Sequence, residues 1–444
     1  MSYSRVTNGG ATAQERARIA RFTGEKNNSM VRSLVLAIAL AGLAAASVWS
    51  ILVGWADYSA RQLTVAGTEK ALALTPWQAA YYVQLAALIS DDDPRRASEA
   101  LQRAVALDPY DSVSWIELGL RVEADGHSAA AEPYFLRAAE VDKEYLPKWT
   151  LANYYFRRDE ESKFWFWAKA AAQMLYGDPL PLFRLSGKVV EDGNLIDRLE
   201  IRRPDIQAAY LTYLLSQNRL DLIGPATYRL LDQGRQSDVP LLLTACDRLM
   251  DAKLVNEALE VWNRLAKARL IPYAPLDPGA EKILTNDSFL PTPAVQGFAW
   301  RLSTVDGISA SREETPSGLR LTFSGAQPEN CEPLFRILPV RENTAYEFTA
   351  LYRTAGIQPD TGLGWRVTDM AGGLIMGAPE SLASEGGAQA KVRFIAPSGC
   401  HLVRIALAYR RALGTTRIEG SIVLREAGLR RTAQFPEKLP GRVM

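Results

Sequence analysis

The sequence predicts a multidomain protein in which a helical part is followed by a β part, with one membrane-spanning helix near the N-terminus. Three observations lead to this prediction. Residues 33–56 carry no charged side chain, a spacing of 34 residues recurs within residues 57–270, and short alternating stretches follow residue 285. The expected order is a transmembrane helix, an α-solenoid and an antiparallel β-sandwich.

The uncharged stretch Ser33–Ala56 lies between Arg32 and Asp57. As a helix, at about 1.5 Å per residue, it would cover about 35 Å, enough to cross a hydrocarbon core of about 30 Å. Trp49 and Trp55 lie towards its far end, and indole rings favour the boundary between membrane and water. We therefore predict a single-pass transmembrane helix.

The flanking charges predict the orientation of this helix. Residues 1–32 contain six lysines and arginines against two glutamates. Because lysine and arginine stay on the cytoplasmic side, residues 1–32 are expected to form a largely disordered cytoplasmic tail. The remainder is then periplasmic or extracellular, held at the inner or plasma membrane. Two alternatives stay open: a cleaved signal peptide, with Leu34–Leu43 as its apolar region and Ala44–Ala46 as its cleavage site, and a buried core helix.

The composition of the 444 residues excludes several kinds of site. A net charge of +1 argues against a nucleic-acid partner, and two histidines, His127 and His401, leave little for metal sites or Ser-His-Asp catalysis. No cofactor and no metal are expected. There are three cysteines; Cys331 and Cys400 fall in one predicted domain and either pair as a disulfide or remain buried thiols.

The repeat is clearest in its large and small residues. Tyr81, Trp115 and Trp149 are each 34 residues apart, as are Ala97 and Ala131, Leu101 and Phe135, and Ala104, Ala138 and Ala172. A period of this size is typical of stacked helical pairs. Alanines lie where the two helices of a pair touch, and each pair must stack on its neighbour to bury its apolar face.

These residues resemble the tetratricopeptide repeat (TPR). The best unit, Ser112–Tyr145, carries Trp115, Leu118, Gly119, Gly126, Ala131, Phe135 and Ala138 at the spacing of that family. The units at 78–111 and 146–177 match in part, and degenerate pairs follow at 204–236 and 237–270. The resemblance implies a protein partner bound by the repeats. Within the third unit, the run 164–167 (Phe-Trp-Phe-Trp) cannot place four rings on one helix face. Trp165 and Trp167 are therefore candidate partner-binding residues, with internal packing as the alternative.

Residues 271–285, with three prolines and a glycine, are predicted to be a linker. The sandwich is expected at 286–430, followed by a C-terminal tail at 431–444. Its predicted strands are 297–302, 318–323, 334–340, 345–354, 362–369, 391–395, 402–410 and 420–425. About eight short strands in this length favour two antiparallel sheets, as a sandwich or jelly roll.

The second half is similar to galactose-binding-like jelly rolls, which include many carbohydrate-binding modules. The segments that carry this resemblance are 286–289, 297–300, 339–348, 352–353, 394–397 and 418–424. It implies a possible polysaccharide ligand, and aromatic faces and polar side chains suit sugars. The candidate ligand-binding residues are Trp365, Trp300, Arg353, Arg404 and Tyr409; for the three rings, core packing is the alternative. Glu419 and Gly420 stand where the family often has aspartate, and the resemblance leaves a calcium site open.

The chain is not expected to be an enzyme. The adjacent pairs Glu160-Glu161 and Glu313-Glu314 lie in predicted loops, and neither a Gly-rich phosphate loop nor a Cys/His metal pattern is present in the sequence. The first hypothesis is a non-enzymatic, membrane-anchored scaffold, resembling accessory proteins of bacterial cell-envelope and exopolysaccharide assembly or export. The second is a glycan-binding protein acting through the jelly roll, and the third a membrane-anchored hydrolase.

Overall fold

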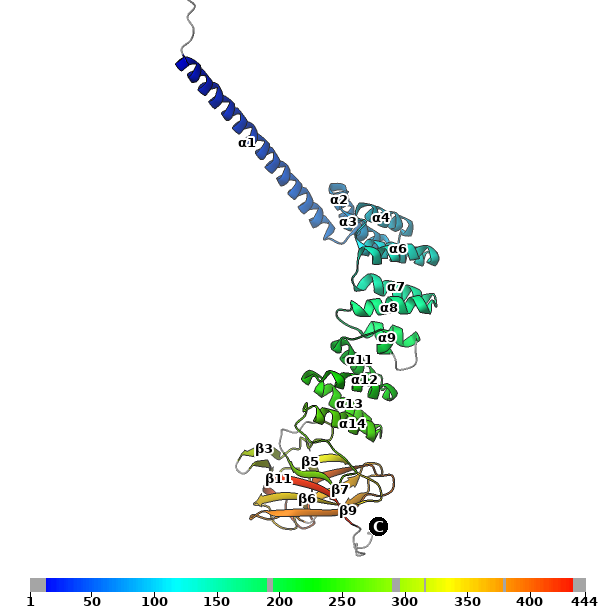
Figure 1. Cartoon of the computed structure of the whole chain (residues 1–444), viewed down its shortest axis with the longest axis vertical. Helices are drawn as coiled ribbons and strands as arrows, with labels where there is room; N and C mark the ends of the chain where they lie inside the picture. The colour runs from blue at the N-terminus through cyan, green and yellow to red at the C-terminus, as the bar shows by residue number, and fades with distance from the viewer. Residues whose placement is uncertain (1–12, 190–194, 290–295, 315–316, 378–380, 434–444) are drawn as a thin grey trace, which may run out of the picture. The chain divides into compact units, whose positions relative to one another are not determined.

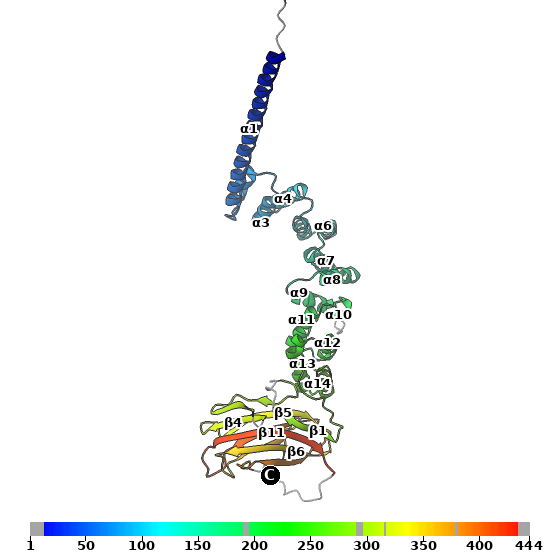
Figure 2. The same cartoon turned by 60° about the vertical axis from the view of Figure 1, so that its left-hand side comes forward.

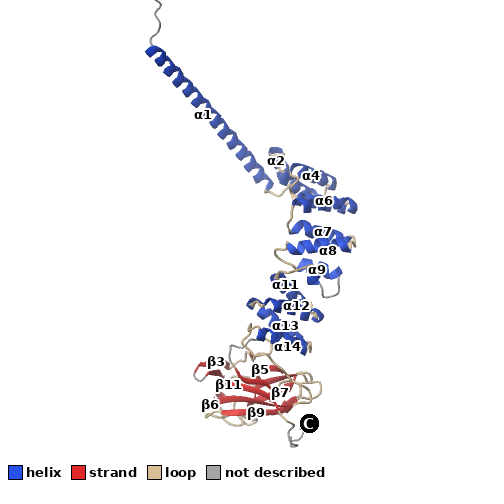
Figure 3. Ribbon diagram, in the orientation of Figure 1, coloured by secondary structure: helices blue, strands red, loops and turns tan. Residues whose placement is uncertain are grey.

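The computed structural model describes residues 13–189, 195–289, 296–314, 317–377 and 381–433. These residues are helical up to residue 267 and form strands from residue 282 onward (Figure 3). The predicted fold class, α then β, is therefore confirmed. The chain divides into two compact units, Met1–Leu175 and Tyr176–Met444, which are described separately.

Helix α1 (Ala13–Ala60) is the long blue helix of Figure 1. Its segment Arg32–Ala60 is long and apolar enough to cross a membrane, and the apolar window within it has no buried residue. The helix starts earlier than the predicted Ser33, because residues 13–31 contain no proline to stop it from extending back from the apolar segment. The predicted disorder of residues 1–32 is thus replaced by helix from Ala13 onward, and residues 1–12 lie outside the described residues.

The remainder of the first unit consists of α2 (Val65–Leu74), α3 (Ala79–Ile89), α4 (Pro94–Leu107), α5 (Ser112–Ala124), α6 (Ser128–Val141), α7 (Tyr145–Arg157) and α8 (Glu161–Gln173). The predicted pairs are α3 with α4, α5 with α6 and α7 with α8. The repeated alanines 97, 104, 131, 138 and 172 are all buried, at 0–3% exposure. The small residues therefore occupy the helix contacts, as their spacing predicts.

One glycine shows how closely such a pair packs. A β-carbon at Gly119 in α5 would lie 2.6 Å from Cε1 of Phe135 in α6, and Phe135 is fully buried. Any larger residue at position 119 would push the two helices apart. The helix starts are equally well specified: Asp93 caps α4 by accepting a hydrogen bond from the Arg96 backbone N–H at 3.1 Å.

The second unit begins with helices: α9 (Leu180–Val189), α10 (Leu195–Arg198), α11 (Pro204–Ser216), α12 (Leu220–Gln233), a 3-10 turn (Gln236–Asp238), α13 (Val239–Asp251) and α14 (Val255–Lys267). The division at Leu175 falls inside the predicted helical domain 57–270. The later helices share a compact unit with the sandwich, a grouping that the repeat pattern did not predict.

The strands form two antiparallel sheets. They are β1 (Lys282–Ser288), β2 (Arg301–Leu302), β3 (Ile308–Glu314), β4 (Ser317–Ser324), β5 (Asn330–Pro339), β6 (Ala345–Ala355), β7 (Leu363–Asp369), β8 (Ile375–Gly377), β9 (Ala388–Ile395), β10 (Leu402–Arg410) and β11 (Glu419–Arg431). One sheet has the order β3-β4-β11-β6-β9, with β1 also paired to β11, and the other has the order β2-β5-β10-β7-β8. Figure 2 shows β6 and β11 side by side. Their antiparallel register pairs Tyr352 with Leu424.

All eight predicted strands occur, with shifted ends. The first shrinks to Arg301–Leu302, and β1, β3 and β8 are additional. Strand β1 starts at Lys282, inside the predicted linker 271–285, and β11 extends to Arg431. Of the predicted tail 431–444, residues 434–444 lie outside the described residues.

Candidate protein-binding groove

The first unit contains a groove of about 320 Å³ formed by α3, α4 and α5. Its walls are the side chains of Val83, Ala86, Ala87, Ser90, Ala97, Leu101, Val113, Glu117, Leu120, Arg121 and Ala124. The volume is within the range of about 300–1,000 Å³ that is usual for ligand sites. Because the lining is mostly apolar with only a few polar groups, the groove is suited to apolar side chains held in a fixed orientation.

One cation gives the groove a polar end. Arg121 donates from Nη1 to Ser90 Oγ at 3.0 Å, and its Nε lies 3.9 Å from Asp125 Oδ1. This Nε is buried and has no hydrogen-bond partner among the described residues. The guanidinium places a positive charge in the groove wall, which Glu117 and the adjacent Asp125 partly balance, and an acidic group of an incoming segment would be attracted to it.

Two aliphatic residues of the groove are exposed: Val113 by 43% and Leu120 by 40%. Single exposed apolar residues are common on protein surfaces, but these two line the same groove beside Arg121. The arrangement can accept a chain segment that offers apolar side chains and an acidic group.

The predicted partner-binding residues Trp165 and Trp167 lie on α8, and neither is among the residues that line the groove. Both are half-buried; Trp165 donates to Glu161 at 3.1 Å and packs edge-on against Phe164, with ring centroids 4.9 Å apart. Phe164 is 1% exposed whereas Phe166 is 64% exposed. The expectation that the four rings cannot share one face is confirmed, and the most exposed ring is that of Phe166, which is not among the predicted partner-binding residues.

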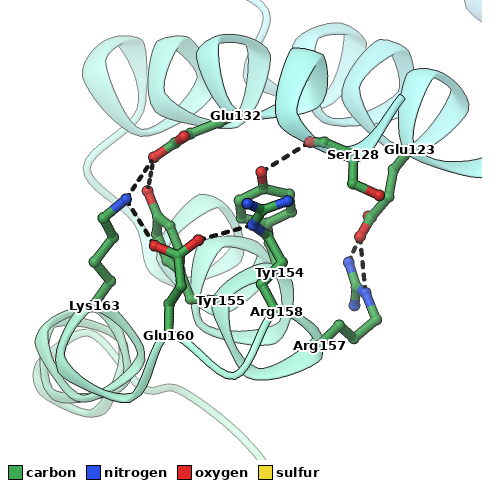
Figure 4. Close-up of polar contacts among 9 residues, drawn as sticks. All are labelled: Glu123, Ser128, Glu132, Tyr154, Tyr155, Arg157, Arg158, Glu160 and Lys163. Atoms are coloured by element: carbon green, nitrogen blue, oxygen red, sulfur yellow. Dashed lines mark hydrogen bonds and ion pairs between the residues drawn. The ribbon is translucent and has the colours of Figure 1, made fainter. Parts of the chain in front are cut away.

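A polar cluster joins α5 and α6 to α7 and α8 (Figure 4). Tyr155 donates to Glu132 at 2.6 Å, and Lys163 lies 3.1 Å from Glu132 and 2.9 Å from Glu160. At its other end Arg157 binds Glu123 at 2.6 Å. The carboxylates of Glu123, Glu132 and Glu160 each form an ion pair with a lysine or an arginine. The cluster therefore links consecutive repeats by ion pairs and does not resemble a catalytic acid–base pair.

This cluster predicts a specific acid sensitivity. The hydrogen bond from Tyr155, followed by Lys163, lowers the pKa of Glu132 below its usual value of 4.5. A lowered folded-state pKa gives stability that is present above 4.5 and is lost as the pH falls through the folded value. Glu132→Gln should cost about 1 kcal/mol at pH 7 and should weaken the loss of thermal stability on acidification. Glu140→Gln, on the exposed side of α6, is the control, and equal behaviour of the two variants in thermal melts from pH 7 to pH 3 would contradict the assignment.

In the sandwich, three predicted ligand-binding rings belong to the core. Trp300 and Trp365 are each 1% exposed, and Tyr409 is fully buried. Trp365 packs against Phe348 and Trp300, with ring centroids 5.0 and 5.8 Å apart. Trp365 is buried because Gly362 directly precedes β7 and Gly364 lies within it. In this strand Leu363, Trp365 and Val367 all point towards the interior. The prediction that these rings face a ligand is therefore corrected.

The two predicted arginines are partly exposed and paired. Arg353 binds Glu313 at 3.2 Å, and Arg404 binds Glu332 at 2.8 Å with its guanidinium 3.4 Å from the Phe335 ring centroid. Among the described residues of 282–433, every aromatic side chain is buried except the half-buried Phe335. That part of the sandwich therefore offers no exposed aromatic platform for a sugar.

The second unit also has a smaller recess, of about 210 Å³, between the α13–α14 turn and the sandwich. It is lined by Met250, Asp251, Lys253, Val255, Ile337, Met370, Ala371, Gly399, His401 and Leu402. This volume is below the range usual for ligand sites. Within the described part of the chain, no group of three or more His, Cys, Asp or Glu side chains could hold a metal ion.

The disulfide alternative is not realised, since Cys331 and Cys400 are both free. Burial, followed by a hydrogen bond with Asp369, raises the pKa of the Cys400 thiol to about 12. A thiol that stays protonated at neutral pH is a poor nucleophile.

Comparisons with known proteins give low overall scores. No protein-family model and no curated protein matches the chain. Among solved structures, YrrB, described as a TPR protein with an unusual peptide-binding site, has a TM-score of 0.24 and 13% identity, covering 46% of this chain and 94% of YrrB. MamA has a TM-score of 0.23 and 20% identity, covering 25% of this chain, which spans 66% of the MamA chain. The CBM22-1 xylan-binding domain of Paenibacillus barcinonensis Xyn10C has a TM-score of 0.23 and 14% identity, covering 32% of this chain and 90% of that domain.

Helical pairs of TPR type and a two-sheet antiparallel sandwich are both present in this chain. The assignment of both folds is based on the helix spacing and the strand order of this chain itself.

Proposed function

We propose that this chain is a non-enzymatic, membrane-anchored scaffold whose TPR-like repeats bind a partner protein. The observation that carries the proposal is the groove of α3, α4 and α5, with exposed Leu120 and Val113 beside the guanidinium of Arg121. The matching partner segment carries an apolar side chain and an acidic group a few residues away.

The anchor in this proposal is Arg32–Ala60 of α1. The excess of lysine and arginine in residues 1–32 supports a cytoplasmic N-terminus, with both units in the periplasm or outside the cell. The combination of an anchored repeat arm with a sandwich supports a role in cell-envelope or exopolysaccharide assembly or export, and this role remains part of the proposal.

The groove is tested with two leucines of nearly equal exposure, Leu120 in the groove (40%) and Leu136 on α6 outside it (41%). In affinity purification of the full-length chain from detergent-solubilised membranes, Leu120→Glu should reduce retention of the partner at least about tenfold, a loss of about 1.4 kcal/mol. Leu136→Glu should retain it. Equal retention by both variants, or failure of the wild-type chain to retain any protein, would refute the proposal.

The structure does not favour the glycan-binding alternative, because the rings predicted to stack on a sugar are core residues. The structure does not favour the hydrolase alternative either, since Glu132, Glu313, Glu332 and Glu347 each form an ion pair with an arginine or a lysine.

A further inference from the structure

Helices α2 and α3 fold back along the end of the apolar helix. Helices α2 and α3 lie beside the C-terminal part of α1 (Figure 1), and Ala56 and Ala60 of α1 are buried together with Ala71 and Tyr81. The approach is close: a β-carbon at Gly67 would lie 2.5 Å from the Ser59 carbonyl oxygen. The residues after the apolar helix therefore do not form a free tether.

Polar contacts fix this arrangement. Tyr81 donates to the carboxylate of Asp57, and Gln84 donates to the Ala60 carbonyl at 2.7 Å and to Thr68 at 2.9 Å. Burial and the hydrogen bond with Asp57 raise the pKa of Tyr81 to about 12, so its phenol remains a donor at neutral pH. The first repeat is thus held to α1 by both apolar and polar contacts.

The turn between α2 and α3 reaches back to Trp49. The Trp77 ring stacks on the Trp49 ring, with centroids 4.8 Å apart and planes 11° apart. Trp49 is 11 residues before the end of α1, or about 16 Å along the helix axis. The tip of the turn therefore lies well back along the apolar segment.

This level coincides with the expected edge of the bilayer. A hydrocarbon core of about 30 Å takes about 20 helical residues; counted from Ser33, they end at Leu52. Trp49 is then one turn inside this edge and Trp55 one turn outside it. Trp77, stacked on Trp49, must lie at the same depth.

The surface of the turn suits that depth. Trp77 is 45% exposed, Trp49 53% and Trp55 64%, and partly exposed indoles near the expected edge of the bilayer are of the kind found at membrane interfaces. From Ala71 to Ser90 the chain contains no charged residue, so no ion would have to be removed from water.

We propose that the α2–α3 turn, with Trp77 at its tip, inserts into the lipid interface beside the apolar helix and seats the first repeat on the membrane surface. This inference rests on the proposed anchoring of α1. The turn would bind at the boundary between the lipid headgroups and the acyl chains. This contact would hold the first repeat at a fixed depth instead of on a flexible tether.

The test uses the full-length chain in phosphatidylcholine vesicles, in a Cys331→Ser background because the other two cysteines are buried. An environment-sensitive NBD fluorophore is placed in turn at three exposed positions by Gln78→Cys, Leu43→Cys and Tyr110→Cys. Gln78→Cys keeps the indole of Trp77, Leu43 is in the middle of the apolar segment, and Tyr110 is 77% exposed on the α4–α5 turn. The quenchers are two lipids, one with a nitroxide near the top of its acyl chain for the label at 78 and one with a nitroxide near the end of the chain for the label at 43, and the label at 110 is measured with both.

The labels at 43 and 78 should be quenched severalfold more strongly than the label at 110, and the label at 78 should have blue-shifted emission. If the label at 43 is quenched but the labels at 78 and 110 behave alike, the turn does not insert into the interface, and the proposed anchor is unaffected. An unquenched label at 43 would overturn the anchor and this inference with it.

Discussion

Trp365→Ala should lower the free energy of unfolding of the sandwich by about 3–5 kcal/mol, the usual cost of truncating a fully buried aromatic side chain. The indole is 1% exposed and lies among Phe289, Trp300 and Phe348. Its removal leaves a cavity that rigid neighbouring rings cannot fill. The loss should appear as a lower temperature of the sandwich transition in calorimetry of the full-length chain in detergent.

Leu351→Ala is the control for this measurement, because Leu351 is on β6 and is 36% exposed. It should change the transition little. A Trp365→Ala variant that melted like the wild-type chain yet lost affinity for an envelope oligosaccharide would return this residue to the role of ligand contact.

Trp262→Ala should have a comparable cost, about 3–5 kcal/mol, and should also loosen the packing of α14 against the sandwich. Trp262 is fully buried, and its ring centroid lies 5.2 Å from that of Tyr273 and 5.8 Å from that of Phe298. Gly297, with φ +66°, comes so close that a β-carbon there would lie 2.8 Å from the indole.

A second contact joins the helices to the start of the sandwich, across the interface that we call the helix–sandwich seam. Asp247 of α13 accepts hydrogen bonds from the Gly297 backbone N–H at 2.8 Å and from Arg301 at 2.6 Å. Because the seam also depends on the indole, Trp262→Ala should speed tryptic cleavage at Arg269, in the segment between α14 and β1. Trp165→Ala, a half-buried indole on α8, should leave this cleavage unchanged. Unaltered cleavage and melting of Trp262→Ala would show that the seam does not require the indole.

The helical half could be predicted because its determinants are local and periodic. The spacing of 34 residues placed Tyr81, Trp115 and Trp149 on the first helices of successive pairs, and the repeated alanines are buried as expected. The repeat also predicted that a binding surface exists, but not its location. Arg121 and Leu120 line the proposed groove only because α3, α4 and α5 pack together, a contact that no short sequence window contains.

The failures in the second half have the same origin. The glycines before Trp365 suggested an exposed turn, yet sheet pairing with β10 places this ring in the interior. Likewise, the proline-rich stretch 271–285 predicts a linker, whereas Tyr273 within it packs against Trp262 and strand β1 starts at Lys282. Burial of a particular ring depends on partners distant in the sequence, and periodicity does not report them.

The six-stranded sheet ends on β3, whose outer backbone groups have no neighbouring strand within the described sheet. An open edge of this kind can recruit a strand from another copy and so start aggregation. This strand is mostly exposed and ends in Arg312, Glu313 and Glu314, and Glu313 is held by both Arg320 and Arg353. A second copy that approached this edge would have to remove water from the exposed charges of Arg312 and Glu314, which opposes edge-to-edge pairing of two chains.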